Sequence, residues 1–192
     1  WNGVIKKLQN QYQCISYDLR GHGNSKPDSS NFSLNDLVAD LEILRSHLKI
    51  EKAHLVGHSL GAMIGSAYAR KFSCNVHSVS LLSTAAFRSK NDQKKVLKII
   101  DNIEKEGINS ILPYLISRWF TDDFINNNPD IIKERMKQVY ETDIKTFLNV
   151  FRIYALTEMG PWLHEVVVPC LVLTGENDIG CNPDLNKNMA KA

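Results

Sequence analysis

The sequence predicts an α/β fold: a mostly parallel sheet with helices on both faces and a helical lid inserted before its last strand. Three observations support this class. Apolar runs alternate with helical segments through the first half of the chain, as in a parallel sheet covered on both faces. Residues 88–165 show only helical patterns, and a further apolar run at residues 170–174 predicts another strand of the sheet. We therefore expect a core of residues 1–87 and 166–192 and a lid of residues 88–165.

The bulk composition is that of an ordinary globular protein. Of 192 residues, 43% are hydrophobic and 23% are charged, which is enough to bury the core of one domain. The formal net charge of +2 gives no electrostatic reason to expect binding to nucleic acid. No apolar run approaches the roughly 20 residues that span a bilayer, so no membrane partner is expected either.

The four cysteines show neither C-x-x-C pairs nor a spacing with histidine that would suggest a metal site. No metal is predicted, and a reduced, cytoplasmic protein is the default expectation. The chain begins with Trp1 rather than Met, so the sequence does not decide whether a signal peptide precedes it. Oligomeric state is not readable from the sequence.

The first half of the chain is expected to alternate helices with strands. Ser33 and Asp36 have the spacing of a capping box, which starts a helix with a leucine-rich stripe. The two strands after it are short apolar runs on either side of a helix rich in small residues. The expected elements are helix 1–10, strand 12–18, helix 34–48, strand 53–57, a helix ending near residue 72, and strand 76–82.

A tight loop follows the first expected strand, where Gly21 and Gly23 bracket His22. No Gly-Lys-Ser/Thr follows it, so the loop is not a phosphate cradle. Arg20 or His22 could face a substrate. Such residues more often tie a loop to neighbouring carboxylates, and the sequence leaves both roles open.

The stretch from residue 88 to residue 165 predicts helices at 92–106, 110–119, 129–140 and 143–156. A helical insertion suits a lid over the carboxyl edge of the sheet. Trp119 and Phe120, at the end of a helix, are our first candidates for substrate binding, although aromatic side chains at helical spacing also form the core of a lid. The aromatic residues of the stretch are Tyr114, Trp119, Phe120, Phe147, Phe151, Tyr154 and Trp162.

Residues 57–61 read Gly-His-Ser-Leu-Gly, a G-x-S-x-G pattern between an expected strand and an expected helix. This is the context of a nucleophile elbow, where the central residue is strained and the flanking glycines avoid clashes. Ser59 would then stand at a helix N-terminus as a nucleophile, and the N–H of Leu60 would point to a developing oxyanion. The alternative is a loop that merely turns a corner.

A last apolar run, residues 170–174, is followed by Glu176 and Asp178. An acid just past a parallel strand lies at the same sheet edge as Ser59, because ligands and catalytic groups gather at the carboxyl ends of the strands. Either acid could act there. A final helix is expected to open at Asn182-Pro183.

Together these residues resemble the α/β-hydrolase family, in particular its lid-bearing branch of 3-oxoadipate enol-lactonases and related serine esterases. The resemblance implies a triad in the order Ser, Asp, His, with Ser59 as nucleophile and Asp178 as the acid, since G-x-x-D is the spacing of the family. It also implies a small ester or lactone as substrate and no cofactor. The matching segments are DLRGHGNS at 18–25, LVGHSLG at 55–61, RWFTDDF at 118–124 and PCLVLTGEND at 169–178.

The sequence departs from the family pattern because no histidine follows Asp178. We expect the catalytic histidine beyond Ala192 and the second oxyanion donor before Trp1, so that the chain is truncated at both ends and inactive by itself. His58 flanks Ser59 in the wrong direction for a base and is a candidate for substrate binding. A non-catalytic ligand-binding or scaffold protein on this fold is the alternative. The six histidines are His22, His47, His54, His58, His77 and His164.

Overall fold

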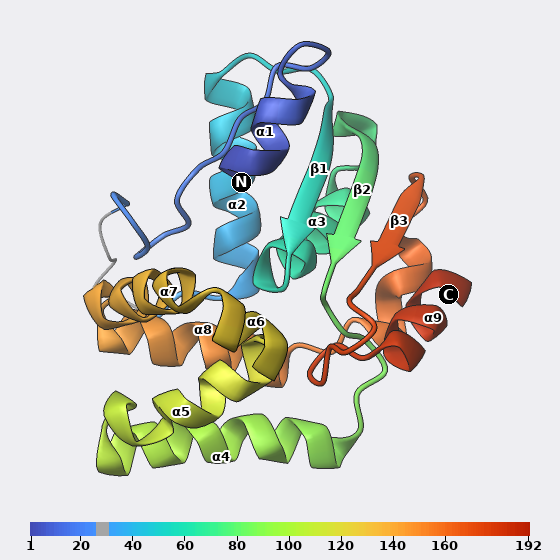
Figure 1. The fold of residues 1–192 in the computed structure, drawn as a ribbon. Helices are drawn as coiled ribbons and strands as arrows, with labels where there is room; N and C mark the ends of the chain where they lie inside the picture. Colours follow the sequence, from blue (N-terminus) through green and yellow to red (C-terminus); the bar gives the residue numbers. More distant parts are fainter. Residues whose placement is uncertain (26–30) are drawn as a thin grey trace.

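The computed structural model describes residues 1–25 and 31–192. Three strands form a parallel sheet in the spatial order β1 (Ala53–His58), β2 (Val76–Leu82) and β3 (Cys170–Leu173). The last residue of β1 lies opposite Leu82, and Leu82 lies opposite Leu173. All three strands therefore end together at one edge of the sheet (Figure 1).

Helices make up most of the remaining described chain. Two short 3-10 helices, η1 (Ser73–Asn75) and η2 (Gly160–Glu165), precede β2 and β3. The α-helices are α1 (Asn2–Leu8), α2 (Leu34–His47), α3 (Leu60–Lys71), α4 (Lys90–Glu106), α5 (Ile108–Trp119), α6 (Asp122–Asn127), α7 (Pro129–Glu141), α8 (Ile144–Leu156) and α9 (Pro183–Lys191).

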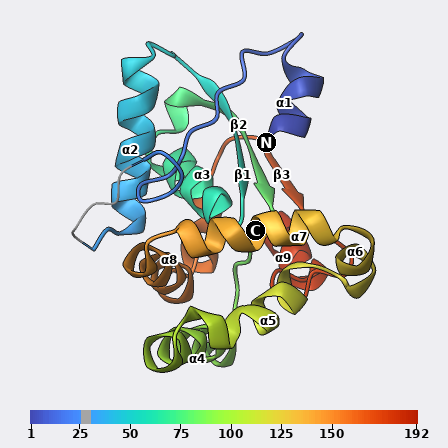
Figure 2. The same ribbon diagram turned by 60° about the vertical axis from the view of Figure 1, so that its left-hand side comes forward.

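The main core lies between the sheet and α3. Helix α3 packs on β1 and β2, and α2 packs on the outer side of α3, while α1 lies on the other side of the sheet (Figures 1 and 2). Met63 and Val79 are fully buried at this contact. Gly65 allows the close approach, since a Cβ there would stand 3.2 Å from Val79. The predicted α/β fold with helices on both faces is confirmed.

The expected strand at residues 12–18 is wrong. The segment is irregular and pairs with no strand of the described chain, and Tyr12, Ile15 and Tyr17 are exposed. A strand exists only if a neighbour satisfies its backbone N–H and C=O groups. Among the described residues β1 pairs only with β2, so an apolar pattern alone could not make this segment a strand.

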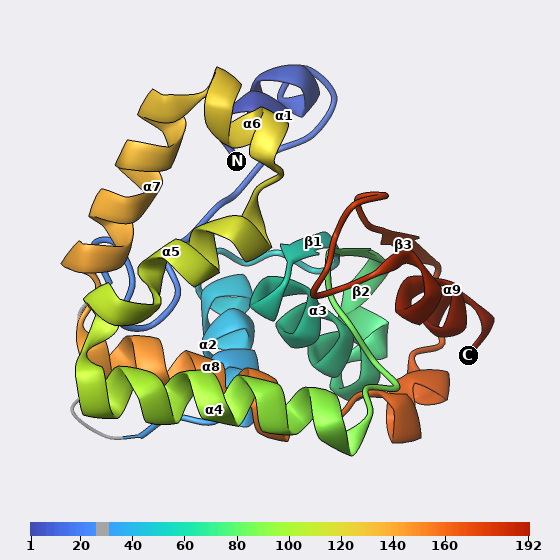
Figure 3. The same ribbon diagram turned by 60° about the horizontal axis from the view of Figure 1, so that its bottom comes forward.

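Helices α4 to α8, which we call the helical block, follow one another without a described strand between them. The block lies across the carboxyl ends of the three strands (Figures 1 and 3). Helix α4 packs against α5 and α8, and Gly107 ends α4 with φ +80°, as predicted. Helix α6 was not predicted; the Thr121 hydroxyl accepts the Phe124 N–H at 3.2 Å and starts it. No described helix is both long and apolar enough to cross a bilayer.

A polar network joins α2 to α3. The carboxylate of Glu42 accepts hydrogen bonds from Nε and Nη2 of Arg45, at 2.9 and 2.7 Å, and from the Tyr68 hydroxyl. These donors, Arg45 foremost, lower the pKa of Glu42 to about 2. The network therefore ties the helix behind the core to the helix that follows Ser59.

Glu42→Gln is expected to lower the free energy of unfolding by about 1 kcal/mol near neutral pH, because the paired carboxylate is lost. The folded pKa lies below the usual 4.5, so the unfolded chain binds more protons and the wild type loses this stability as pH falls from about 4.5 towards 2. The variant should lose less across that range. Urea unfolding at neutral and acid pH measures both effects. Glu134→Gln, on an exposed face of α7, is the control, and equal acid slopes in wild type and Glu42→Gln would contradict the expectation.

Candidate active site

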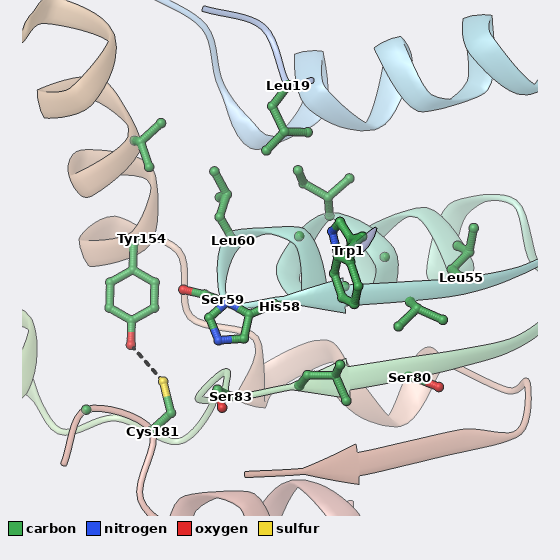
Figure 4. Close-up of a pocket in the computed structure, with 18 of the residues that line it drawn as sticks. Trp1, Leu19, Leu55, His58, Ser59, Leu60, Ser80, Ser83, Tyr154 and Cys181 are labelled. Atoms are coloured by element: carbon green, nitrogen blue, oxygen red, sulfur yellow. Dashed lines mark hydrogen bonds between the residues drawn. The ribbon is translucent and has the colours of Figure 1, made fainter. Parts of the chain in front are cut away.

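The chain passes from β1 into α3 through a strained turn at Ser59. Its φ of 54° and ψ of −114° are a combination that residues other than glycine rarely adopt. The Ser59 N–H donates to the Leu82 carbonyl of β2 at 2.9 Å, and its own carbonyl accepts the Ala62 N–H at 3.0 Å. The hydroxyl makes no capping bond to α3 and lies beside His58 at the end of the strand (Figure 4). The turn has the geometry of a nucleophile elbow.

The two flanking glycines differ in their reason for being there. A Cβ at Gly57 would overlap the carbonyl group of Gly61 and the nitrogen of Ala62, so the turn closes only without a side chain. A Cβ at Gly61 would meet no described atom within 4 Å. The expectation that both glycines avoid clashes is right for Gly57 and wrong for Gly61, because Gly61 borders the open cavity described below and not a packed neighbour.

Leu60 is the first residue of α3. The first N–H groups of a helix have no intrahelical carbonyl to bind, and the helix dipole makes this end partly positive. The Leu60 side chain is buried in the main core, which fixes the orientation of its backbone. Its N–H is therefore one of the first N–H groups of α3, directly after Ser59.

Asp178 lies in the loop after β3, and two backbone donors hold its carboxylate. Oδ1 accepts the N–H groups of Gly180 and Cys181, at 3.0 and 2.7 Å. Oδ2 lies 3.2 Å from the Thr174 hydroxyl, whose single proton has the Cys181 carbonyl as a nearer acceptor at 2.8 Å. An ionised carboxylate has about four lone-pair sites, so Oδ2 can still accept a further hydrogen bond. Glu176, the other candidate acid, is exposed on the same loop.

A cavity of about 2450 Å³ opens at the carboxyl ends of the strands and continues along β1 towards α1. Ser59 follows β1 and Asp178 follows β3, so both lie at the same edge with the end of β2 between them. The residues of the predicted site therefore line one cavity, whereas Arg20 and His164 do not line it. The sequence-predicted residues that line the cavity are His58, Ser59, Leu60, Trp119, Phe120 and Asp178.

His58 is the last residue of β1, and charged side chains from two other elements shift its pKa. Desolvation in the cavity lowers the pKa of His58, the Asp178 carboxylate raises it, and Arg135 of α7 lowers it further. The acid loop and the helical block therefore both reach the space around this ring (Figure 4). With a lowered pKa the imidazole is neutral at neutral pH and can donate or accept a hydrogen bond without carrying charge.

Trp119 and Phe120 stand where α5 ends. The Arg135 guanidinium lies 5.4 Å from the centroid of the Trp119 ring, and Phe120 stacks on Phe124 with ring centroids 5.4 Å apart. Both side chains also line the cavity. They therefore combine the two roles that the sequence left open, packing within the helical block and lining of the pocket.

Three residues of the cavity wall were not singled out from the sequence. Tyr154 of α8 lies beside Ser59, and its hydroxyl is directed at Sγ of Cys181, 3.5 Å away (Figure 4). Ser83, which follows β2 with φ of 45°, lies near the same turn (Figure 4). Tyr154 was only one lid aromatic among seven, and no local pattern marks Ser83 or Cys181. Only their positions after neighbouring strands could have suggested them.

Other polar candidates have structural roles or lie elsewhere. Arg20 pairs with Asp40 of α2 through bonds of 2.9 and 2.7 Å, so it ties its loop to a helix. The His22 ring lies 3.0 Å from the Arg20 carbonyl and lines the cavity. His164 is exposed on η2 and does not line the cavity. Across residues 1–25 and 31–192, no group of His, Cys, Asp and Glu side chains is arranged to hold a metal ion.

The Gly57→Ala substitution is expected to destabilise the protein by about 3 kcal/mol, because the new Cβ forces the backbone of Gly61 and Ala62 out of place. Gly61→Ala, with no described atom near the new Cβ, is the matched control. It should change the free energy of unfolding by no more than about 1 kcal/mol, the gain of alanine over glycine inside a helix. Urea denaturation of both variants measures the difference. Equal stability of the two variants would refute the close-approach explanation.

Comparisons with known proteins agree with this geometry. The family model for the alpha/beta hydrolase fold matches residues 1–192. Over 178 residues the chain is 26% identical to 3-oxoadipate enol-lactonase 2 of Acinetobacter baylyi, covering 93% of this chain and 66% of that protein. It is also 26% identical over 195 residues to an (E)-2-((N-methylformamido)methylene)succinate hydrolase of that organism, covering 99% and 72%. The chain thus spans about two thirds of the length of the first of these relatives.

Among solved structures, the enol-lactonase of Burkholderia xenovorans LB400 has the same arrangement of elements. Its TM-score is 0.90 at 24% identity, and the match covers all of this chain and 73% of that one. At this identity the likeness concerns the fold.

Proposed function

The chain belongs to the α/β-hydrolase fold family, and on that premise we propose that the protein is a serine hydrolase that cleaves a carboxylic ester or lactone through an acyl-enzyme intermediate. The observation that carries the proposal is the strained turn at Ser59, which places a hydroxyl at the N-terminus of α3 on a cavity that Asp178 also lines. A hydroxyl in that position is suited to attack a carbonyl carbon.

In the proposed reaction Oγ of Ser59 forms a bond to the acyl carbon while its proton passes to a histidine. The carbonyl oxygen becomes an oxyanion that accepts the Leu60 N–H, a donor worth roughly 3 kcal/mol in comparable sites. Collapse of this intermediate breaks the ester C–O bond, and the histidine returns the proton to the leaving oxygen. Water then hydrolyses the acyl-enzyme by the same steps. Asp178 keeps the histidine in the required tautomer and stabilises its charged form.

The general base in this scheme is not assigned to any of the six histidines. None follows Asp178 in the chain, and the family order places the base after the acid. A second candidate function is a non-catalytic ligand-binding protein with the hydrolase fold, because a fold does not fix a function. In such a protein Ser59 would be an ordinary cavity hydroxyl without enhanced reactivity, and this difference can be measured.

The substrate class is proposed from the relatives and from the charges over the cavity. The named relatives are hydrolases of an enol-lactone and of a substituted succinate. Helical-block residues Arg118 and Arg135 line the cavity, and the Arg118 guanidinium lies next to Gly180 on the acid loop. Positive side chains in this position suit a small anionic ester or lactone. In this proposal residues 88–165 act as a lid over the core of residues 1–87 and 166–192, and no cofactor takes part.

Ser59→Ala is expected to abolish both labelling by a fluorophosphonate probe and hydrolysis of a p-nitrophenyl ester, because it removes the attacking oxygen. The full-length natural protein is used for both assays. Ser110→Ala removes an exposed hydroxyl of α5 that does not line the cavity and is the control, which should retain label and activity within about threefold. A wild type that neither labels nor hydrolyses would favour the binding protein, and label retained in Ser59→Ala would exclude Ser59 as the nucleophile.

Asp178→Asn is expected to lower kcat by about 10²–10⁴-fold, since the amide cannot stabilise a charged histidine. The substitution keeps the shape of the side chain, so the fold should persist. Glu176→Gln, on the same loop, should change kcat by less than about threefold because its carboxylate is exposed. Steady-state kinetics compares the two. A larger loss in Glu176→Gln would transfer the acid role to Glu176.

A further inference from the structure

Two chain segments, residues 87–88 and 157–160, connect the helical block to the sheet, and we call them the neck. The Glu158 carboxylate joins them. It accepts the N–H groups of Phe87 and Arg88, at 2.7 and 3.1 Å, and the N–H of Gly160 at 2.9 Å. Met159 between them is fully buried, and its sulfur lies 3.2 Å from the Ser66 hydroxyl of α3, which also reaches the Met63 carbonyl at 3.0 Å. The neck is thereby fixed to the helix that follows Ser59.

Arg88 is the buried cation of the neck, with a side chain only 3% exposed. Its Nη2 donates to the Thr157 carbonyl, its Nε lies 3.6 Å from the Glu158 carboxylate, and its guanidinium lies 4.4 Å from the centroid of the Tyr154 ring. Nε and Nη1 have no hydrogen-bond partner in the described chain. A buried charge needs compensation, and here the Thr157 carbonyl, the Glu158 charge and the face of the Tyr154 ring supply it.

Tyr154 contacts both Arg88 and the acid loop, and so connects the neck to that loop. One side of its ring faces Arg88, and its hydroxyl meets Sγ of Cys181 at 3.5 Å. The backbone N–H of Cys181 in turn donates to Oδ1 of Asp178 at 2.7 Å. Burial raises the pKa of the Tyr154 phenol, Cys181 raises it further, and the Asp178 charge adds the smallest contribution. A continuous set of contacts therefore runs from the neck to the candidate catalytic carboxylate.

We propose that Arg88 is a positioning residue that sets Tyr154 against Cys181, so that the helical block and the Asp178 carboxylate are held in one fixed geometry. The kinetic consequence rests on the proposed function, but the structural consequence does not. Loss of the guanidinium removes the group that packs on the Tyr154 ring, so the ring moves more freely and covers Cys181 less tightly.

The chain provides a matched arginine for comparison. Arg70 of α3 pairs with Glu165 at 2.8 and 2.9 Å and lies 5.2 Å from the Trp162 ring centroid. This is the same combination of a carboxylate and an aromatic face, but the Arg70 side chain is 40% exposed and does not line the cavity. Replacing Arg70 removes the same kinds of contact without touching the neck.

The first test measures alkylation of Cys181 by iodoacetamide near pH 8, followed by peptide mass spectrometry. Cys181 is 7% exposed, and burial raises its pKa to about 11, so it should react slowly in the wild type. Cys74 and Cys170 are exposed and serve as internal references. Arg88→Met should speed alkylation of Cys181 at least about tenfold through more frequent local opening, whereas Arg70→Met should not change it.

Arg88→Lys keeps the positive charge but not the planar fork, and should restore part of the protection. Circular dichroism checks that each variant folds. If Arg88→Met does not fold, Arg88→Lys decides, because it lacks the planar guanidinium that faces the Tyr154 ring and should show faster alkylation of Cys181 than the wild type. Unchanged alkylation of Cys181 in folded Arg88→Met, or in Arg88→Lys when that variant decides, would overturn the proposal.

The second test uses ester hydrolysis by the full-length protein. Arg88→Met should lower kcat by about tenfold or more while KM stays within about threefold, since the carboxylate is displaced and the substrate pocket remains. Arg88→Lys should recover part of kcat, and Arg70→Met should match the wild type. An unchanged kcat in folded Arg88→Met would overturn the positioning role. A wild type without hydrolysis would refute the proposed function instead, and the alkylation result would still decide whether Arg88 holds Tyr154.

Discussion

The close contact between Gly57 and the backbone of Gly61 is the constraint on which the rest of the site depends. It lets β1 turn into α3 within a single residue, and that residue, Ser59, takes a left-handed φ as a consequence. The strain is stabilised by its surroundings, since Ser59 is hydrogen-bonded to the end of β2 and α3 is buried against the sheet. A hydroxyl is thereby held at a helix N-terminus, where negative charge is favoured.

The parallel register of the sheet brings the loop that carries Asp178 to the same edge as Ser59. Because β1, β2 and β3 end level with one another, the loops after them reach a common cavity, and each supplies a polar residue: Ser59, Ser83 and Asp178. The helical block covers this edge and is anchored through the neck. Side chains from α5, α7 and α8 then complete the wall, so the pocket is shared between the core and the block.

Local patterns were sufficient for the elements that satisfy their own hydrogen bonds. The capping box at Ser33, the end of α4 at Gly107 and the Ser59 turn all depend on residues within a few positions of one another. The segment 12–18 shows the limit of such patterns, because a strand depends on a partner elsewhere in the chain. Gly61 is a second example of this limit. Whether a Cβ at this position would clash depends on the atoms around it in the folded protein, and the sequence pattern does not specify them.

The sequence by itself determined the α/β class, the turn at Ser59 and the presence of an acid after the last strand, because each follows from short-range spacing and backbone sterics. Only the tertiary structure decided which side chains face one another. The contacts of Arg88 with Tyr154, and of Tyr154 with Cys181, join residues that are 66 and 27 positions apart. No local pattern specifies such pairs, since burial and charge compensation act between elements only after the chain has folded.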